Sequence, residues 1–329
     1  MPATYFASPM RTVLLLAAIL GLGACSESGC SDCGPFATQW RELDAPMPTP
    51  RRALTGSIVV TDAFAYELYV IGGETLGEAP LGTVEILDVT TETWRSTTPL
   101  STARAGLTSA VVNGRVYAIG GRNQTGALDA VEVYDPTTEE WVARASLPTP
   151  RAALGAASVG DNIYVIGGTT SDGLPSALVD VYDTTTDTWQ QASEMPTARS
   201  GALVVAVGFD IFVIGGWNGT DLATTEKYNT MTGTWDTLTP VPVPPGEGVF
   251  GAELFGSIFV MGGHNLQGEI SALVQRYDID IDRWSSSPPM NPARAHATAA
   301  AVDLGTRGWI YVVGGDDGTT LLERAAALF

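Results

Sequence analysis

Five arginines recur along the chain at a nearly constant spacing, and together they could hold an anionic ligand. They are Arg51, Arg104, Arg151, Arg199 and Arg294. A guanidinium group presents a planar pair of donors that suits a carboxylate or a sugar acid. A second interpretation pairs each arginine with a recurring acid: Glu85, Glu132, Asp180, Glu226 and Glu323. We favour the pairing, because a ligand without sixfold symmetry does not require the same residue in every repeat. Gly246 replaces the arginine in one repeat, so any ligand would approach asymmetrically.

A second group of polar and aromatic residues follows Gly-Gly doublets and differs from repeat to repeat. Its members are Arg122, Asn123, Trp217, Asn218, His264, Asn265, Asp316 and Asp317. Trp217 suits stacking on a sugar ring or gripping a partner's side chain, and the alternative is that it folds back onto its own loop. We expect this group to share one face of the fold with the arginines and to form a ligand-binding surface there.

Residues for catalysis or metal binding are few. The chain has two histidines, His264 and His296, and no Ser–His–acid or Cys–His arrangement can be located. We expect His296 to be a core residue, because it lies in a segment of small residues. His264 and Asp316 supply too few ligands for a metal, and the alternating Asp278, Asp280 and Asp282 lack the glycine and distal glutamate of a calcium loop. We therefore expect no metal and no cofactor, and leave enzymatic activity open.

The elements that position these residues come from a repeat of Gly-Gly doublets and tryptophans. The doublets, 47–52 residues apart, are Gly72-Gly73, Gly120-Gly121, Gly167-Gly168, Gly215-Gly216, Gly262-Gly263 and Gly314-Gly315. The tryptophans are Trp40, Trp94, Trp141, Trp189, Trp235 and Trp284. A period of this length indicates an array of identical supersecondary units. We expect the tryptophans to pack between neighbouring units.

Each repeat is predicted to contain four short antiparallel strands. In the second repeat, residues 105–112 and 115–119 flank Asn113-Gly114, a strong hairpin signal. Residues 130–134 form a third strand, and a polar turn leads to a fourth that begins at Trp141. Four strands per period predict one blade of a β-propeller. First strands are rich in glycine, alanine and serine, as crowding around a central axis requires.

The two ends of the propeller region predict how the ring closes. No doublet precedes Trp40, and no tryptophan follows the last doublet, Gly314-Gly315. A strand at Trp40 can therefore become the outer strand of the last blade. The predicted fold is an all-β, single six-bladed propeller over residues 39–329, closed by this N-terminal strand.

The repeat resembles the kelch family. The resemblance rests on the doublet after a second strand, a Val-Glu-x-Tyr-Asp third strand and a tryptophan after a short turn, and it covers residues 39–329. Leu87, Lys227, Arg276 and Gly246 depart from the pattern. The WD40 propeller is the rival, but only Trp235 is followed by aspartate. The resemblance implies a binding module, although some periplasmic six-bladed kelch proteins are sialic-acid epimerases. One branch of these propellers carries copper-radical oxidase chemistry, which we do not expect here because His264 and Asp316 supply too few metal ligands.

The first residues are predicted to target the chain rather than to fold. Residues 1–24 have the character of a signal peptide, and Leu22-Gly23-Ala24-Cys25 resembles a bacterial lipobox with Cys25 as the lipidated residue. Residues 25–38 would then form a flexible tether in which Cys30 and Cys33 close a small disulfide loop. We expect a lipid-anchored protein of the cell envelope, with the outer membrane as the favoured site.

The charge of the chain limits its partners. With a formal net charge of -19 in 329 residues, it has no electrostatic reason to bind nucleic acid or an anionic lipid surface. We expect a monomeric binding module that presents a loop-rich face to a protein or a glycan. The alternatives are a carbohydrate-active enzyme such as a sialic-acid epimerase, and a scaffold within an envelope complex.

Overall fold

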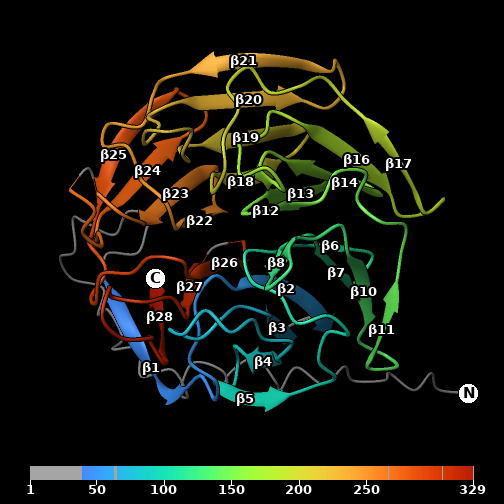
Figure 1. The fold of residues 1–329 in the computed structure, drawn as a ribbon. Coiled ribbons are helices and arrows are strands. Elements are labelled where there is room, and N and C mark those ends of the chain that lie inside the picture. Colours follow the sequence, from blue (N-terminus) through green and yellow to red (C-terminus); the bar gives the residue numbers. More distant parts are fainter. Residues whose placement is uncertain (1–38, 63–64, 266, 306, 329) are drawn as a thin grey trace, which may run out of the picture. The chain divides into compact units, whose positions relative to one another are not determined.

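The computed structural model describes residues 39–62, 65–265, 267–305 and 307–328, and these form a six-bladed β-propeller. Six four-stranded antiparallel sheets are arranged in a ring (Figure 1), and their inner strands line a central channel. The predicted fold class is confirmed. Cys25, Cys30 and Cys33, with the rest of residues 1–38, lie outside the described residues. No helix in the described part of the chain has the length and apolar character of a membrane span.

The strands of each blade follow one another outwards from the axis. Those of the first three blades are β2 (Thr55–Asp62), β3 (Ala65–Ile71), β4 (Val84–Asp88), β5 (Thr93–Ser96); β6 (Thr108–Val112), β7 (Arg115–Ile119), β10 (Val131–Asp135), β11 (Glu140–Ala143); and β13 (Gly155–Val159), β14 (Asn162–Ile166), β16 (Val179–Asp183), β17 (Thr188–Gln191). Short pairs β8 (Arg122–Asn123) with β9 (Gly126–Ala127), and β12 (Arg151–Ala152) with β15 (Thr169–Thr170), lie in the loops.

The remaining blades repeat the same order, except that the last takes its outer strand from the start of the fold. Their strands are β18 (Leu203–Val207), β19 (Asp210–Ile214), β20 (Thr225–Asn229), β21 (Thr234–Leu238); β22 (Val249–Leu254), β23 (Ser257–Gly262), β24 (Val274–Asp278), β25 (Arg283–Ser287); and β26 (Thr298–Asp303), β27 (Gly308–Val313), β28 (Arg324–Leu328), β1 (Trp40–Pro46).

β1 closes the ring by pairing with β28. The register joins Trp40 to Leu328 and Glu42 to Ala326, and the two strands lie side by side in Figure 1. Leu43 is fully buried and packs into a cluster that spans the first and last blades. The closure predicted from the isolated Trp40 is therefore what the structure shows.

The tryptophans join each blade to the one before it. Every repeat indole donates its Nε1 proton to a backbone carbonyl of the preceding blade's outer strand region, with partners Trp40–Pro288, Trp94–Ala45, Trp141–Thr98, Trp189–Ala145, Trp235–Ser193 and Trp284–Thr239. Four of these indoles also pack on a tyrosine of the third strand of their own blade, with ring centroids 4.9–5.1 Å apart. The six indole hydrogen bonds run between neighbouring blades, where the tryptophans were expected to pack, whereas the tyrosine contacts lie within one blade.

Small residues line the inner strands because neighbouring blades approach closely there. A Cβ added to Gly56 in β2 would lie 2.7 Å from Cγ2 of Thr298 in β26. Bulk is instead concentrated in strands two and three, where Tyr69, Tyr134, Tyr182 and Tyr277 are buried. The small side chains of the inner strands line a central channel, and loops surround one end of it, which we call the channel mouth.

Candidate functional site at the channel mouth

The five repeated arginines do not form a ligand-binding ring. Each is at most 1% exposed. Four pair with the acid of their own blade, in the pairs Arg51–Glu85, Arg104–Glu132, Arg151–Asp180 and Arg199–Glu226. Burial lowers the pKa of these four guanidinium groups, and the facing carboxylate opposes that shift. The structure thus corrects the anion-ring prediction and confirms the pairing in four blades; Arg294 is buried too, but it does not pair with the exposed Glu323.

The arginines instead connect neighbouring blades. Arg151 Nη1 donates to the carbonyl of Gly167 in its own blade, at 2.8 Å, and the Arg151 carbonyl accepts from the Gly121 amide of the preceding blade, at 2.9 Å. A Cβ at Gly120, where φ is 61°, would lie 2.7 Å from that same Arg151 carbonyl, which explains why the doublet is glycine. Burial, pairing and doublet contacts together assign the arginines a structural role.

An inner ring of backbone surrounds the channel mouth, two residues beyond each arginine position. All six of its residues have positive φ: Ala53, Gly106, Ala153, Gly201, Gly248 and His296. Five amides of the ring donate to the equivalent carbonyl of the preceding blade, for example Gly106 to Ala53 at 2.8 Å and Ala53 to His296 at 2.9 Å. A left-handed conformation suits glycine and is costly for a bulky residue. His296 is the one large side chain in this ring.

An outer set of residues lies beside the inner ring and supplies most of the charged side chains of the mouth. In each blade, the residue that follows the doublet pairs through its backbone with the residue that follows the repeated arginine, or Gly246 in the fifth blade. The pairs are Arg52–Glu74, Ala105–Arg122, Ala152–Thr169, Ser200–Trp217, Glu247–His264 and Ala295–Asp316. Charged side chains therefore come from blades one, two, five and six, whereas blades three and four contribute neutral ones.

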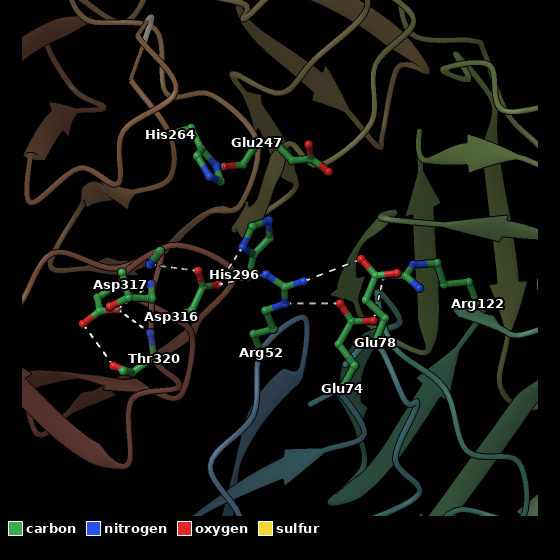
Figure 2. Close-up of polar contacts among 12 residues, drawn as sticks. Arg52, Glu74, Glu78, Arg122, Glu247, His264, His296, Asp316, Asp317 and Thr320 are labelled. Atoms are coloured by element: carbon green, nitrogen blue, oxygen red, sulfur yellow. Dashed lines mark hydrogen bonds and ion pairs between the residues drawn. The ribbon is translucent and has the colours of Figure 1, made fainter. Parts of the chain in front are cut away.

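A cavity of about 670 Å³ lies at this mouth. Its charged and titratable lining residues are Arg52, Glu74, Glu78, Arg122, Glu247 and His296. Thr169, Thr170 and Ser171 line its neutral side. Figure 2 shows the charged side, where Arg52 is central and Glu247 extends away from the other groups. The charged groups are thus confined to one part of the cavity wall.

Arg52 and Arg122 share one buried carboxylate. Arg122 Nη2 donates to Glu74 Oε2 at 2.7 Å, and Arg52 Nε lies 3.3 Å from Glu74 Oε1, although without hydrogen-bond geometry. Arg52 also lies 3.9 Å from carboxylate oxygens of Glu78 and of Asp316. These contacts fix Arg52 between the first and last blades, while Glu78 and Arg122 remain open to solvent.

His296 and Asp316 form a second pair beside Arg52. Nδ1 of His296 lies 3.1 Å from Oδ2 of the buried Asp316. Burial raises the pKa of Asp316, but the hydrogen bond with His296, the positive charges nearby and the Gly318 amide outweigh it and lower the pKa. His264 packs edge-on to His296, with ring centroids 5.3 Å apart, and its Nδ1 contacts the Glu247 carbonyl at 2.8 Å. His296 therefore lines the cavity at the mouth, which corrects the prediction that it belongs to the core.

Several other predicted residues serve their own loops. Side-chain oxygens of Asn123, Asn265 and Asp317 each accept a backbone N–H two to four residues ahead. Trp217 is 40% exposed, and with Asn218 it lies outside the lining of the cavity, on the neutral side of the mouth. In the part of the chain that the structure describes, no cluster of three or more His, Cys, Asp or Glu side chains is arranged to hold a metal.

Sequence reasoning missed Arg52, Glu74, Glu78 and Glu247. A signal existed, because the position after each repeated arginine is alanine or serine in four blades but Arg52 in the first and Glu247 in the fifth. The next position is small in five blades and histidine in the last. Aligning the repeats on the arginine rather than on the doublet exposes both departures.

Comparison with known protein families supports the propeller fold. The model of the kelch motif matches residues 60–101, 103–148, 150–196, 198–242 and 256–291, which is more than half of the chain. The chain belongs to the kelch family. This kelch propeller is 37% identical over 104 residues to a putative F-box/kelch-repeat protein of Arabidopsis thaliana, covering 29% of this chain and 42% of that protein. It is 31% identical over 96 residues to Kelch-like protein 21 of Homo sapiens, covering 29% of this chain and 15% of that protein.

The alignments span less than half the length of these curated relatives. Among solved structures, the kelch propeller resembles that reported as the structure of YjhT, with a TM-score of 0.72, 19% identity, and coverage of 85% of this chain and 95% of that one. At this identity the likeness concerns the fold alone.

Proposed function

We propose that this kelch propeller is a protein-interaction module that docks a basic segment of its partner at the channel mouth. One observation carries the proposal: carboxylates outnumber guanidinium groups at the mouth. Glu74, Glu78 and Glu247 line the cavity and Asp316 is buried beside it, whereas the guanidinium groups are those of Arg52 and Arg122. Kelch membership supports a protein partner, and the excess of negative charge favours a cationic group on it.

The remaining features of the mouth support a peptide-like ligand. The neutral side of the cavity is lined by Thr169, Thr170 and Ser171, and the exposed Trp217 lies on that side. A partner segment with a basic residue next to an apolar one would match both the charged and the neutral side of the mouth. The net charge of -19 would also speed the approach of a basic partner at low salt.

The test is selection of a peptide display library on the purified chain, followed by affinity measurement. We expect the selected peptides to contain lysine or arginine. Glu78→Gln combined with Glu247→Gln should weaken a selected peptide about tenfold at low salt, because two open carboxylates are lost. The effect should shrink at high salt, where charges are screened.

The matched control is Asp236→Asn on the outer strand β21, which removes one exposed carboxylate away from the mouth. It should leave the affinity unchanged. Selection of acidic peptides, or equal weakening by Asp236→Asn, would contradict docking at the mouth.

A second candidate is a sialic-acid epimerase, and one observation favours it. The His296–Asp316 pair lies beside Arg52, so a proton-transfer group and a carboxylate-binding group are adjacent. The surrounding carboxylates oppose an acidic sugar, and we rank this candidate below the interaction module. Accelerated mutarotation of sialic acid, followed by NMR and abolished by His296→Gln, would reverse that order. A scaffold role in an envelope complex would use the same docking surface.

We also propose that the chain is attached to the cell envelope through a lipid on Cys25. The support is the lipobox-like Leu22-Gly23-Ala24-Cys25 after an apolar stretch. Because each buried methylene contributes about 0.8 kcal/mol, acyl chains on one cysteine hold a protein firmly. Cys25→Ser should move the chain from the membrane fraction to the soluble fraction, with Cys30→Ser as the control. Unchanged membrane partitioning of Cys25→Ser would exclude the anchor.

A further inference from the structure

Arg294 differs from the other repeated arginines in having no carboxylate partner among the described residues. It is 1% exposed, and its Nη1 and Nη2 atoms donate to the carbonyls of Gly314, at 3.1 Å, and Arg324, at 2.8 Å. Arg199 makes the equivalent carbonyl contacts and in addition binds Glu226 at 2.7 Å. The last blade therefore keeps the arginine and its backbone contacts but lacks the acid.

The strand register identifies the residue that replaces the acid. In the second blade Glu132 lies opposite Ala118, two residues before the doublet. In the last blade the residue two before the doublet is Val312, and it lies opposite Ala326. Ala326 thus occupies the acid position, with a side chain too short to reach a guanidinium group.

Two further comparisons show that the last blade differs from the others in keeping the arginine without its acid. The hydroxyls of Thr49 and Thr197, two residues before their arginines, donate to the carboxylate, whereas Pro292 holds that position before Arg294. The fifth blade has lost arginine and acid together: Gly246 replaces one and Gln275 the other. Among the repeated arginines of the described blades, Arg294 alone is left without an ion pair.

A cavity of about 270 Å³ opens beside Arg294. It is lined by Glu42, Pro292, Arg294, Thr320, Leu321, Leu322, Glu323 and Arg324. Glu42 of β1 lies opposite Ala326 in the register, but it is exposed and forms no ion pair with Arg294 within 4.0 Å. The space beside the guanidinium group is large enough for a small organic anion.

The environment of Arg294 favours an added negative charge. Burial lowers its pKa to about 10, and Glu42 opposes that shift only in part. Removing one partner of a buried ion pair is costly. A bound anion would restore to Arg294 the ion pair that the other four arginines form with the acid of their own blade. A monovalent planar carboxylate matches the geometry of the missing side chain, whereas a divalent anion would be repelled by Glu42 and Glu323.

We propose that the cavity beside Arg294 binds a small carboxylate anion in place of the acid that the last blade lacks. The carboxylate accepts hydrogen bonds from the guanidinium group at the seam between β28 and β1. The site is separate from the channel mouth and does not depend on the function proposed for it.

The experiment compares thermal unfolding of the full chain in sodium acetate and in sodium chloride at equal ionic strength. Acetate at about ten times its dissociation constant should raise the midpoint by about 3 °C. Ala326→Glu should raise the midpoint without acetate and abolish the response to it. Ala326→Ser, which adds no carboxylate, should respond like the unmodified chain.

Glu42→Gln provides a second test on an exposed side chain whose loss does not threaten the fold. It should tighten acetate binding several-fold, measured by saturation-transfer NMR, because a nearby negative charge is removed. Equal midpoints in acetate and chloride, an acetate response retained by Ala326→Glu, or weaker acetate binding by Glu42→Gln would each overturn the proposal.

Discussion

Deletion of residues 39–47 should remove most of the stability of the propeller. The deletion takes away Leu43 and Met47, which are 0% and 1% exposed. Loss of each buried side chain costs about 2–5 kcal/mol, and a whole domain is stable by only about 5–15 kcal/mol. The deletion also leaves the outer edge of β28 without a pairing strand, and exposed strand edges promote aggregation. We expect circular dichroism to show a greatly lowered unfolding midpoint and gel filtration to show aggregates.

Point variants in β1 test the contribution of buried side chains without removing the strand. Leu43→Ala should lower the free energy of unfolding by about 2–5 kcal/mol. Asp44→Ala, one residue further along β1, changes an exposed side chain and should have little effect. A truncated chain that unfolds at the midpoint of the intact one would show that β1 does not close the ring.

Arg104→Met should destabilise the propeller by about 3–5 kcal/mol, because it leaves the carboxylate of Glu132 buried without its charge partner. It also removes the donor to the carbonyl of Ala118. The second replacement, Glu132→Leu, should recover part of the loss when added to Arg104→Met. Urea unfolding of the single and double variants measures the coupling between the two side chains.

Arg115→Met in the same blade is the matched control. Arg115 pairs with Asp135 at 2.8 Å, but its side chain is 51% exposed. A surface ion pair contributes about 0–1 kcal/mol, so this variant should unfold almost like the unmodified chain. Similar losses for Arg104→Met and Arg115→Met would mean that burial does not set the importance of the repeated arginines.

The fold could be predicted from the sequence because each blade repeats the same physical requirements. A doublet is needed where a Cβ would collide with the next blade's backbone, and a tryptophan is needed where an indole bridges two blades. Six copies of these requirements fix the number of blades. The isolated Trp40 then indicates the closure, because one outer strand is missing at the other end of the repeat array.

The site could be predicted only in part, because its residues stand at positions that are small and unremarkable in most repeats. His296 occurs among alanines and resembles a core residue until its backbone conformation, with φ at 54°, places it in the inner ring. Arg52 follows Arg51 in the sequence, yet one is buried in a blade and the other lines the mouth. The difference between the two residues depends on the direction in which each side chain points, and the repeat pattern does not predict this direction.

The pairing of β1 with β28 also determines the order of events during synthesis. Within the propeller, β1 is made before the other strands, but its partner β28 (Arg324–Leu328) is made after all of them. The other blades pair strands that are close in the sequence and can form while the chain grows. Leu43 therefore lacks the part of its cluster that the last blade supplies until the ribosome has passed residue 328. We expect this long-range contact to set the slowest step of folding, and the unclosed ring to be the form that a chaperone or a protease meets.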